Sequence, residues 1–479
     1  MGGGPVIEAL SVTSECVPLV KTGGLADVAG ALPGALLGHG VRMRTLLPGY
    51  PAVMAAVTDA QVVADYDALF DGSARVLAAK AAGLDLLVLD APHLFDRDAG
   101  IYLNADGADW PDNPERFAAL CRVAADIAAG RLADWVPQIV HCHDWQAGLT
   151  PYYITRDGTQ VGTVVTIHNI AFQGLAPATR GAALGIAASD FTAEKVEYFG
   201  QLSALKAGLI CADRLTTVSP TYAQELMTPE FGMGLDGVLR ARRDVLSGIL
   251  NGIDEDVWSP ATDPLITPYK TPRGKTANTR ALRAEFGLPE ANGPLCVVIS
   301  RLTGQKGLDL LLEALPTLLD RGGQLALLGS GDPALEHAFT QHDSPNVAAR
   351  IGYDEALSHR IMAGGDAILV PSRFEPCGLT QLYGLRYGTL PVVALTGGLA
   401  DTVIPATPAT MARDVATGIQ FHPITADALS SALTKLCDLF EQPKTWSRMQ
   451  RNAMAHPVGW GPSAAAYAAL YTELTEGSR

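Results

Sequence analysis

The chain reads Leu295-Cys-Val-Val-Ile-Ser300 and then Arg301-Leu-Thr-Gly-Gln-Lys-Gly307, an apolar run of strand length followed by a polar loop that contains glycine. A Leu-rich segment of helix length comes next. A strand, a glycine-containing loop and a helix in this order are typical of a βαβ unit, whose strands are buried in a parallel sheet. This part of the sequence therefore predicts an α/β fold.

The same order recurs in both halves of the chain. Short runs rich in Val, Ile and Leu alternate with longer Ala- and Leu-rich segments. Two such series predict two doubly wound domains. The expected strands are Val6–Val12, Val41–Leu47, Leu84–Leu89, Gln138–His141, Gly162–Ile167 and Arg214–Val218 in the first half, and Leu295–Ser300, Gln324–Leu328, Val347–Ile351, Ala367–Val370 and Leu390–Ala394 in the second.

The length of the chain also favours two domains. It has 479 residues, whereas single hydrophobic cores stop growing at roughly 250–300 residues. The segment from Asn251 to Gly293 is rich in proline and shows little periodicity, as is typical of a segment between domains. We expect one domain over residues 1–250 and a second over residues 251–457.

Composition excludes several classes of protein. The formal net charge is −15, which argues against nucleic acid or an anionic membrane as the main partner. No apolar run approaches the ~18–20 residues that span a bilayer, and Met1-Gly-Gly-Gly-Pro5 lacks the basic start of a signal peptide. The seven cysteines are scattered without a CxxC pair, so neither a zinc site nor a disulfide framework is expected. These features favour a cytoplasmic location.

Polar loops follow the predicted strands, at the place where open α/β sheets bind ligands. Thr396-Gly397-Gly398 precedes a predicted helix, so its backbone amides can hold a phosphate, although ordinary βα turns look the same. Arg301 and Lys306 leave a buried strand together and suit a diphosphate, although such pairs also occur on solvated surfaces.

Further candidates are one carboxylate and a group of histidines. Glu375 follows a predicted strand, where a carboxylate can accept hydrogen bonds from sugar hydroxyls or partner a helix N-terminus. His168 also follows a strand. His141 and His143 share a strand face, with Asp144 on the other, but they have no clear third metal ligand, so a structural role is favoured.

Other ligand motifs are weak or absent in the sequence. Three Asp-x-Asp triplets could hold a divalent metal, but none follows a predicted strand in a glycine-rich loop, and we interpret them as solvated loop charges. A Walker A loop and a GxSxG elbow are absent, and Gly329-Ser-Gly331 lacks the acidic residue of a dinucleotide site. The triplets are Asp65-Tyr-Asp67, Asp96-Arg-Asp98 and Asp254-Glu-Asp256.

Six stretches, in order over nearly the whole chain, resemble glycosyltransferase family 5, which comprises the bacterial glycogen synthases and the plant starch synthases. The strings that begin at Lys21 and at Ser372 are the most specific. The stretches are Lys21-Thr-Gly-Gly-Leu-Ala-Asp-Val28, His143-Asp-Trp-Gln-Ala-Gly-Leu149, Thr166-Ile-His-Asn169, Ser300-Arg-Leu-Thr-Gly-Gln-Lys-Gly307, Pro371-Ser-Arg-Phe-Glu-Pro-Cys-Gly-Leu-Thr-Gln-Leu-Tyr383 and Thr396-Gly-Gly-Leu-Ala-Asp-Thr-Val403.

The resemblance implies a GT-B architecture, in which two Rossmann-like domains face a central cleft. The first would bind the glucan and the second the nucleotide sugar, and a C-terminal helix within residues 458–479 would return to the first domain. The implied reaction transfers glucose from ADP-glucose to the non-reducing 4-hydroxyl of an α-1,4-glucan such as glycogen, with retention of the α configuration. It implies no metal and no other cofactor.

The resemblance also implies roles for single residues. Tyr353 would stack on adenine and Asn251 would touch the sugar, while the two cations would hold the diphosphate. The implied catalytic residues are Glu375, His168, Asp144, Arg301 and Lys306. The other implied substrate contacts are Lys21, Gly24, Asp27, Cys377, Gly378, Leu379, Thr396, Gly397 and Gly398.

Three alternatives stay open at the level of sequence. The donor could be UDP-glucose, the chain could be a phosphorylase with lysine-bound pyridoxal phosphate, or it could be a catalytically silent glucan- or nucleotide-binding module. A retaining mechanism with a protein nucleophile needs a second carboxylate about 5–5.5 Å from the first. The position eight residues after Glu375, acidic in some related transferases, is Tyr383, so we hypothesise attack from the same face, with the leaving phosphate oxygen taking the proton.

Overall fold

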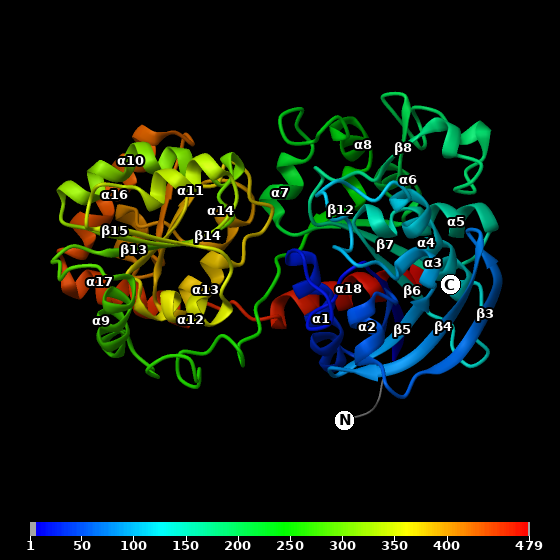
Figure 1. The fold of residues 1–479 in the computed structure, drawn as a ribbon, viewed down its shortest axis with the longest axis horizontal. Coiled ribbons are helices and arrows are strands. Elements are labelled where there is room, and N and C mark those ends of the chain that lie inside the picture. The colour runs from blue at the N-terminus through cyan, green and yellow to red at the C-terminus, as the bar shows by residue number, and fades with distance from the viewer. Residues whose placement is uncertain (1–5, 478–479) are drawn as a thin grey trace. The chain divides into compact units, whose positions relative to one another are not determined.

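The computed structural model describes residues 6–477 and divides the chain into two compact α/β units (Figure 1). Unit 1 comprises the chain up to Val218, residues 223–250 and the segment from Trp460 onward. Unit 2 comprises Ser219–Tyr222 and Asn251–Gly459. Each unit has its own mostly parallel sheet, as expected from the two series of strands.

The sheet of unit 1 has nine strands in the order β12-β11-β7-β6-β1-β2-β5-β4-β3. Neighbours are parallel from β12 to β5, and β4 and β3 add an antiparallel edge. The strands are β1 (Ile7–Val12), β2 (Val41–Pro48), β3 (Gln61–Leu69), β4 (Gly72–Ala81), β5 (Leu84–Asp90), β6 (Ile139–His143), β7 (Gly162–Ile167), β11 (Arg214–Thr217) and β12 (Leu246–Gly248).

The six strands expected in this half are all present, within two residues of their expected ends. Strands β6 and β7 are buried along their whole length, because helices cover both faces of a parallel sheet. They therefore appear in the sequence as continuous apolar or β-branched runs.

The β3–β4 hairpin was not expected from the sequence. It forms the antiparallel edge of the sheet, and much of β3 is exposed. Asp65 and Asp67 lie on β3, so their interpretation as loop charges is wrong, although both side chains are exposed to solvent. A half-exposed strand contains fewer apolar residues than a buried one, which is why a search for apolar runs misses it.

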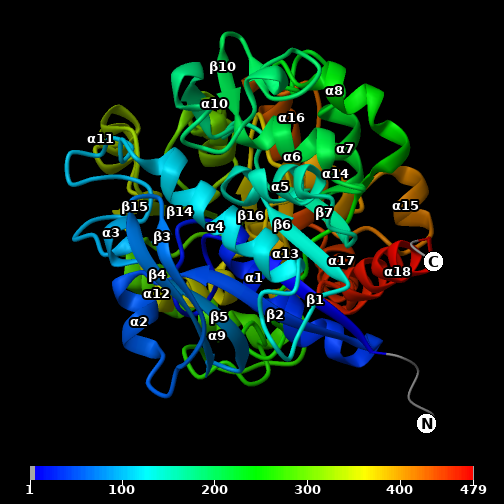
Figure 2. The ribbon, with the colours of Figure 1, turned by 90° about the vertical axis from the view of Figure 1, so that its right-hand side faces the viewer.

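Unit 1 also contains the C-terminal helix α18. It packs against α1 (Figures 1 and 2). Its Tyr467 and Tyr471 are fully buried in the core that the two helices share. The helix implied at the C-terminus is therefore present. The α-helices of unit 1 are α1 (Gly24–Leu36), α2 (Pro51–Ala56), α3 (Pro92–Phe95), α4 (Asn113–Ala128), α5 (Leu149–Asp157), α6 (Ala204–Cys211), α8 (Asp236–Ala241) and α18 (Gly461–Gly477), and α7 (Pro220–Glu225) begins in unit 2 and ends in unit 1.

A small antiparallel sheet lies outside the main sheet of unit 1. It has the strand order β8-β10-β9, with β8 at Leu175–Pro177, β9 at Glu197–Tyr198 and β10 at Gln201–Ser203. A tight turn at Phe199-Gly200 joins β9 to β10. This sheet follows the loop after β7, which contains His168.

The sheet of unit 2 has six parallel strands in the order β15-β14-β13-β16-β17-β18. Its strands are β13 (Leu295–Ile299), β14 (Gln324–Gly329), β15 (Val347–Ile351), β16 (Ala367–Val370), β17 (Leu390–Ala394) and β18 (Ile419–Phe421). Its helices are α9 (Lys275–Phe286), α10 (Leu308–Asp320), α11 (Pro333–Thr340), α12 (Glu355–Gly364), α13 (Thr380–Tyr387), α14 (Gly397–Thr402), α15 (Pro408–Ala412), α16 (Ala426–Phe440) and α17 (Pro443–Ala455).

The core of unit 2 lies between this sheet and the helices on its two faces (Figure 1). Only β18, with three residues, was not expected. Because β13, β16 and β17 are parallel, the loops that follow them leave the same edge of the sheet. Within residues 6–477, the helices are all too short or too polar to cross a bilayer.

Candidate active site

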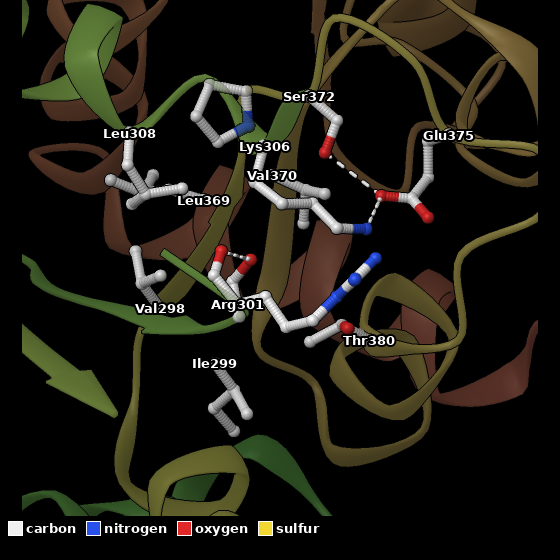
Figure 3. A pocket seen from close by; sticks show the side chains of 12 residues that line it. Val298, Ile299, Arg301, Lys306, Leu308, Leu369, Val370, Ser372, Glu375 and Thr380 are labelled. Carbon is white, nitrogen blue, oxygen red and sulfur yellow. Dashed lines mark hydrogen bonds and ion pairs between the residues drawn. The ribbon is translucent and has the colours of Figure 1, made fainter. Parts of the chain in front are cut away.

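The predicted cations and carboxylate of unit 2 line one cavity of about 180 Å³ (Figure 3). Arg301 and Lys306 come from the loop after β13, and Glu375 comes from the loop after β16. Ser300, Ser372 and Thr380 complete the polar part of the wall. The parallel order of the strands brings these loops together, as the sequence predicts.

Lys306 and Glu375 form an ion pair inside this cavity. The Lys306 Nζ atom lies 2.5 Å from Glu375 Oε2, and the Ser372 hydroxyl donates to the same oxygen at 3.0 Å. Glu375 is 8% exposed and Ser372 is fully buried, so the carboxylate depends on these two donors for its position. The guanidinium of Arg301 points toward the same region as the ammonium (Figure 3).

The Gly397-Gly398 pair lets the start of α14 approach the Glu375 loop closely. The Gly398 amide donates to the carbonyls of Glu375 at 3.1 Å and of Pro376 at 3.0 Å. A Cβ atom on Gly398 would lie 2.2 Å from the Cys377 carbonyl oxygen, and Gly397 has a left-handed backbone with φ of 44°. Glycine is therefore required at both positions, and the predicted phosphate turn packs directly against the predicted sugar loop.

Cys377 contributes to this loop as a buried thiol. It is 5% exposed, and burial raises its pKa to about 12, while a backbone hydrogen bond from Asn251 lowers it. The Gln381 amide donates to the carbonyls of Cys377 at 3.0 Å and Gly378 at 2.9 Å and so fixes the turn before α13. Cys377 is therefore a thiol at neutral pH and shapes the loop. Leu379, the residue before α13, is partly buried.

Tyr353 lies apart from these groups. It follows β15, its side chain is 77% exposed, and its hydroxyl contacts the carboxylate of Glu355. Among the described residues it is not part of the wall of the Arg301 cavity. Most of the Tyr353 side chain is therefore accessible to solvent in this structure.

In unit 1 a buried carboxylate holds the loop that begins at Lys21. Glu15 accepts hydrogen bonds from the Thr22 amide at 2.5 Å, the Gly23 amide at 3.1 Å, the Thr22 hydroxyl at 2.6 Å and the Tyr102 hydroxyl at 2.7 Å. Glu15 is 4% exposed, whereas the loop itself is exposed. The buried carboxylate therefore holds the exposed backbone of Thr22 and Gly23 in place.

Lys21, at the start of this loop, pairs with Asp27 in the first turn of α1. The Lys21 Nζ atom lies 2.8 Å from Asp27 Oδ1, and the lysine side chain is 46% exposed. Gly24, the first residue of α1, is exposed and has open space around its Cα. Among the predicted residues of this motif, the exposed parts are therefore the Lys21 side chain and the backbone of Gly24.

Asp144 has an unusual backbone directly after β6. Its φ of 55° lies in the left-handed region, and its side chain is 7% exposed. Asp144 Oδ1 accepts hydrogen bonds from the His168 amide at 2.6 Å and the Asn169 amide at 3.3 Å. Burial raises the pKa of this carboxyl to about 7, the two amides lower it, and the nearby charge of Glu15 raises it further.

Three histidines lie together between β6 and the loop after β7. His143 Nδ1 lies 3.0 Å from His168 Nε2, and His141 bonds to the hydroxyls of Tyr471 at 2.7 Å and Thr166 at 2.6 Å. The rings of His141 and His143 are 4.3 Å apart, which confirms that they share a strand face. Burial lowers the pKa of His143 to about 3 and those of His141 and His168 well below their usual value, so all three are neutral at pH 7.

Two residues of these sites were not singled out from the sequence, and the role of a third was not foreseen. Glu15 and Ser372 both come shortly after a strand, which was the only available signal, and many polar residues share it. His143 was noted, but not as the partner of His168. The contact of His143 with His168 joins β6 to the loop after β7, whereas the backbone contacts of Glu15 and the hydroxyl contact of Ser372 depend on how a single loop folds back on itself, so spacing alone does not reveal them.

Comparison with known proteins places both units in described families. A family model described as the starch synthase catalytic domain matches residues 8–241, and one described as glycosyl transferases group 1 matches residues 293–438. A glycogen synthase of Paracoccus denitrificans is 64% identical over 97% of this chain and 99% of its own length. A glycogen synthase of Jannaschia sp. is 63% identical over 96% of this chain and 98% of its own length.

Solved structures agree with this result. The catalytic domain of starch synthase IV from Arabidopsis thaliana, solved with ADP and acarbose, has a TM-score of 0.85 and 32% identity, and the match covers 99% of this chain and 100% of that chain. A sucrose-phosphate synthase from Thermosynechococcus elongatus, with a TM-score of 0.61 and 18% identity, shares the fold. The identity along the full length and the GT-B-like pair of parallel sheets together show that this chain belongs to the glycogen and starch synthase family of glucosyltransferases.

Proposed function

We propose that this chain transfers glucose from ADP-glucose to the non-reducing 4-hydroxyl of an α-1,4-glucan, with retention of the α configuration and release of ADP. The observation that supports this most directly is the cavity of unit 2, in which Arg301, Lys306 and Glu375 meet. Membership of the family supports the choice of a glucosyl donor and a glucan acceptor. The solved relative that bound ADP and acarbose supports the same pair of ligands.

Unit 2 is the proposed donor domain, over residues 251–457. Arg301 and Lys306 hold the diphosphate with the Thr396-Gly397-Gly398 turn, and they attract it more strongly as negative charge grows on the departing ADP. Glu375 is already positioned by Lys306, and its carboxylate accepts hydrogen bonds from the glucose hydroxyls. Further proposed contacts to the donor are Tyr353 at the adenine and Asn251, Cys377, Gly378 and Leu379 at the sugar.

Unit 1 is the proposed acceptor domain, over residues 1–250, completed by the helix within 458–479. His168 is neutral, so it suits hydrogen bonding to a sugar better than compensation of charge. Asp144 fixes the backbone of His168 through its amide. Lys21 is a proposed substrate-binding cation of this unit, with Gly24 and Asp27 in the same motif.

The proposed reaction proceeds by attack from the face that the leaving group vacates. The C–O bond between glucose and phosphate breaks, a phosphate oxygen of ADP takes the proton of the acceptor hydroxyl, and the new glycosidic bond forms on the same face. Glu375 then supports the positive charge on the sugar and does not form a covalent bond to it. This assignment needs one carboxylate at the sugar, which is what the cavity of unit 2 contains.

The test is incorporation of labelled glucose from ADP-, UDP- and GDP-glucose into glycogen, followed by precipitation of the polymer. Wild type is expected to use ADP-glucose, and Glu375→Gln to lower turnover roughly 100-fold or more. The control Glu313→Gln changes an exposed carboxylate on α10 and is expected to leave turnover unchanged. A folded wild type that binds ADP without incorporating label would favour a silent module, and absorbance of a bound pyridoxal group would favour a phosphorylase.

We also propose that the protein is cytoplasmic. The seven cysteines are free, and six of them are buried, which suits a reducing compartment. Fractionation of cells that express the chain tests this, because recovery in a secreted or periplasmic fraction would contradict it.

A further inference from the structure

Two left-handed turns in unit 1 present apolar side chains to solvent. Phe199 and Met233 have φ of 45° and 47°, and each is followed by a glycine, Gly200 and Gly234, with φ of 81° and 76°. Phe199 is 79% exposed and Met233 is 45% exposed. Several other non-glycine residues within 6–477 have a left-handed backbone. Among all of them, Phe199 and Met233 are the ones with a large apolar side chain that is exposed.

The two turns lie against each other. A Cβ atom on Gly234 would come within 2.9 Å of the Phe199 ring and 3.2 Å of the Tyr198 hydroxyl oxygen. The rings of Tyr198 and Phe199 are 4.8 Å apart and nearly perpendicular. Tyr198, Phe199 and Met233 therefore form one small surface, called the aromatic patch below.

Hydrogen bonds hold both turns in place. The Tyr198 hydroxyl donates to the Met233 carbonyl at 2.6 Å, and the Gly200 amide donates to the Glu197 carboxylate at 2.6 Å. Lys206, which is 6% exposed, donates to the backbone carbonyl of Glu197 at 2.5 Å. The backbone of both turns is thus tied to neighbouring segments by hydrogen bonds.

Folding alone does not explain this arrangement. Bulky residues rarely adopt a left-handed backbone, because of steric clash, and an exposed phenylalanine gains little from burial. Asn-Gly is the pair that favours such turns. Strain that the surrounding contacts maintain, at two adjoining exposed positions, is a feature associated with binding sites.

We propose that the aromatic patch binds the glucan acceptor, as a site for glucose rings in addition to those at the reacting end. Glucose rings have apolar C–H faces that stack on aromatic side chains, and Glu197 and Gln201 flank the patch with polar groups for the hydroxyls. The proposal rests on the proposed function, which supplies a long α-1,4-glucan as substrate.

The position of the patch in unit 1 favours a glucan that also reaches the catalytic loop. Gln173 lies in the same loop as His168, between β7 and β8, and its amide donates to the Met233 carbonyl at 3.1 Å. The strand and the helix that follow the two turns, β10 and α8, lie at one end of unit 1 (Figure 2). The size of the patch also fits a sugar chain better than a protein, since protein interfaces use about 20–30 residues a side.

The test uses the full chain with Phe199→Asn, Met233→Asn and the double variant. The control is Leu37→Asn, which removes a side chain of unit 1 that is 65% exposed and lies outside the patch. Affinity for glycogen is measured without donor, by retardation in native gels that contain glycogen. Melting temperature, sedimentation and the KM values for glycogen and ADP-glucose are measured on the same samples.

We expect the patch variants to bind glycogen roughly 3- to 10-fold more weakly, with a matching rise in KM for glycogen and an unchanged KM for ADP-glucose. Their melting temperature should stay the same or rise, because Asn relieves the left-handed strain, whereas a purely structural patch would lose stability. The control should bind glycogen like wild type.

Wild-type affinity for glycogen in the double variant would overturn the proposal. So would a wild-type dimer that the variants dissociate, because the patch would then be a contact between copies of this chain. If wild type transfers glucose and the variants still bind glycogen normally, the patch proposal alone fails. If wild type transfers no glucose but the variants lose glycogen binding, the proposed function fails and the patch remains a binding site.

Discussion

His143 Nδ1 lies 3.0 Å from His168 Nε2, so two neutral imidazoles share one hydrogen bond. Within the described residues, the other ring nitrogen of His143, Nε2, is buried and has no partner. Buried N–H groups without a partner are rarer than buried acceptors without one. The proton of His143 is therefore assigned to Nδ1, which donates to His168 and leaves the proton of His168 on its own Nδ1.

Replacement of His143 tests this assignment. His143→Phe keeps the ring but removes the donor, and we expect turnover to fall about tenfold because His168 loses its orientation. His143→Asn returns an amide donor and should recover part of the loss. The measurement is the steady-state rate with ADP-glucose and glycogen. Equal rates for His143→Phe and wild type would show that His143 does not position His168.

Asp144 should make the folded state less stable as the pH rises, which is the opposite of the usual effect of a buried, ion-paired carboxylate. Its pKa is raised from 3.8 to about 7, so the folded state keeps a proton that the unfolded state loses as the pH rises above 4. The contribution of this group to stability therefore falls between pH 4 and 7, by up to about 4 kcal/mol. It stays constant above that range.

The variant Asp144→Asn isolates this effect. Asn can accept the same amide hydrogen bonds and tolerates the left-handed backbone. We expect urea unfolding to show similar stability for variant and wild type near pH 4 and a more stable variant at pH 8. A difference between the two proteins that does not change with pH would contradict the assigned shift.

Glu15 should stabilise the loop after Lys21. Glu15→Gln removes a charge that accepts four hydrogen bonds, so the free energy of unfolding is expected to fall by about 2–4 kcal/mol. Hydrogen exchange should become faster at the amides of Thr22 and Gly23. Asp244→Asn, at a side chain that is 94% exposed, serves as the control and should change neither quantity. Unchanged exchange in Glu15→Gln would show that other contacts hold the loop.

Gly398 should tolerate no side chain. In Gly398→Ala the new Cβ would lie 2.2 Å from the Cys377 carbonyl oxygen, so the Glu375 loop must move, and kcat/KM is expected to fall roughly 100-fold. Gly34→Ala is the matched control, because that glycine lies in α1 with no atom within 4 Å of the new Cβ, and the added helix propensity should stabilise by about 0.5–1 kcal/mol. Near-normal activity in Gly398→Ala would show that the close approach of the two loops is not needed.

Much of the fold could be predicted from the sequence because buried parallel strands leave a strong pattern. The run Leu295–Ile299 and the loop from Arg301 to Gly307 show it most clearly, and their place at the edge of a sheet follows from the βαβ rule. The hairpin of β3 and β4 was missed, since an exposed edge carries no continuous apolar run. Residues such as Arg301, Lys306 and Glu375 could be selected because they follow strands and because the motifs resemble a known family.

By itself, the sequence determined the positions of most buried strands along the chain, the polar loops at their ends and the resemblance to a family. Only the tertiary structure decided which side chains pair: Lys306 with Glu375, and Glu15 with the backbone of Thr22 and Gly23. The physical reason is that periodicity reports local burial along one element. A hydrogen bond between residues 69 positions apart, as in the first pair, depends instead on how separate strands stack in the sheet.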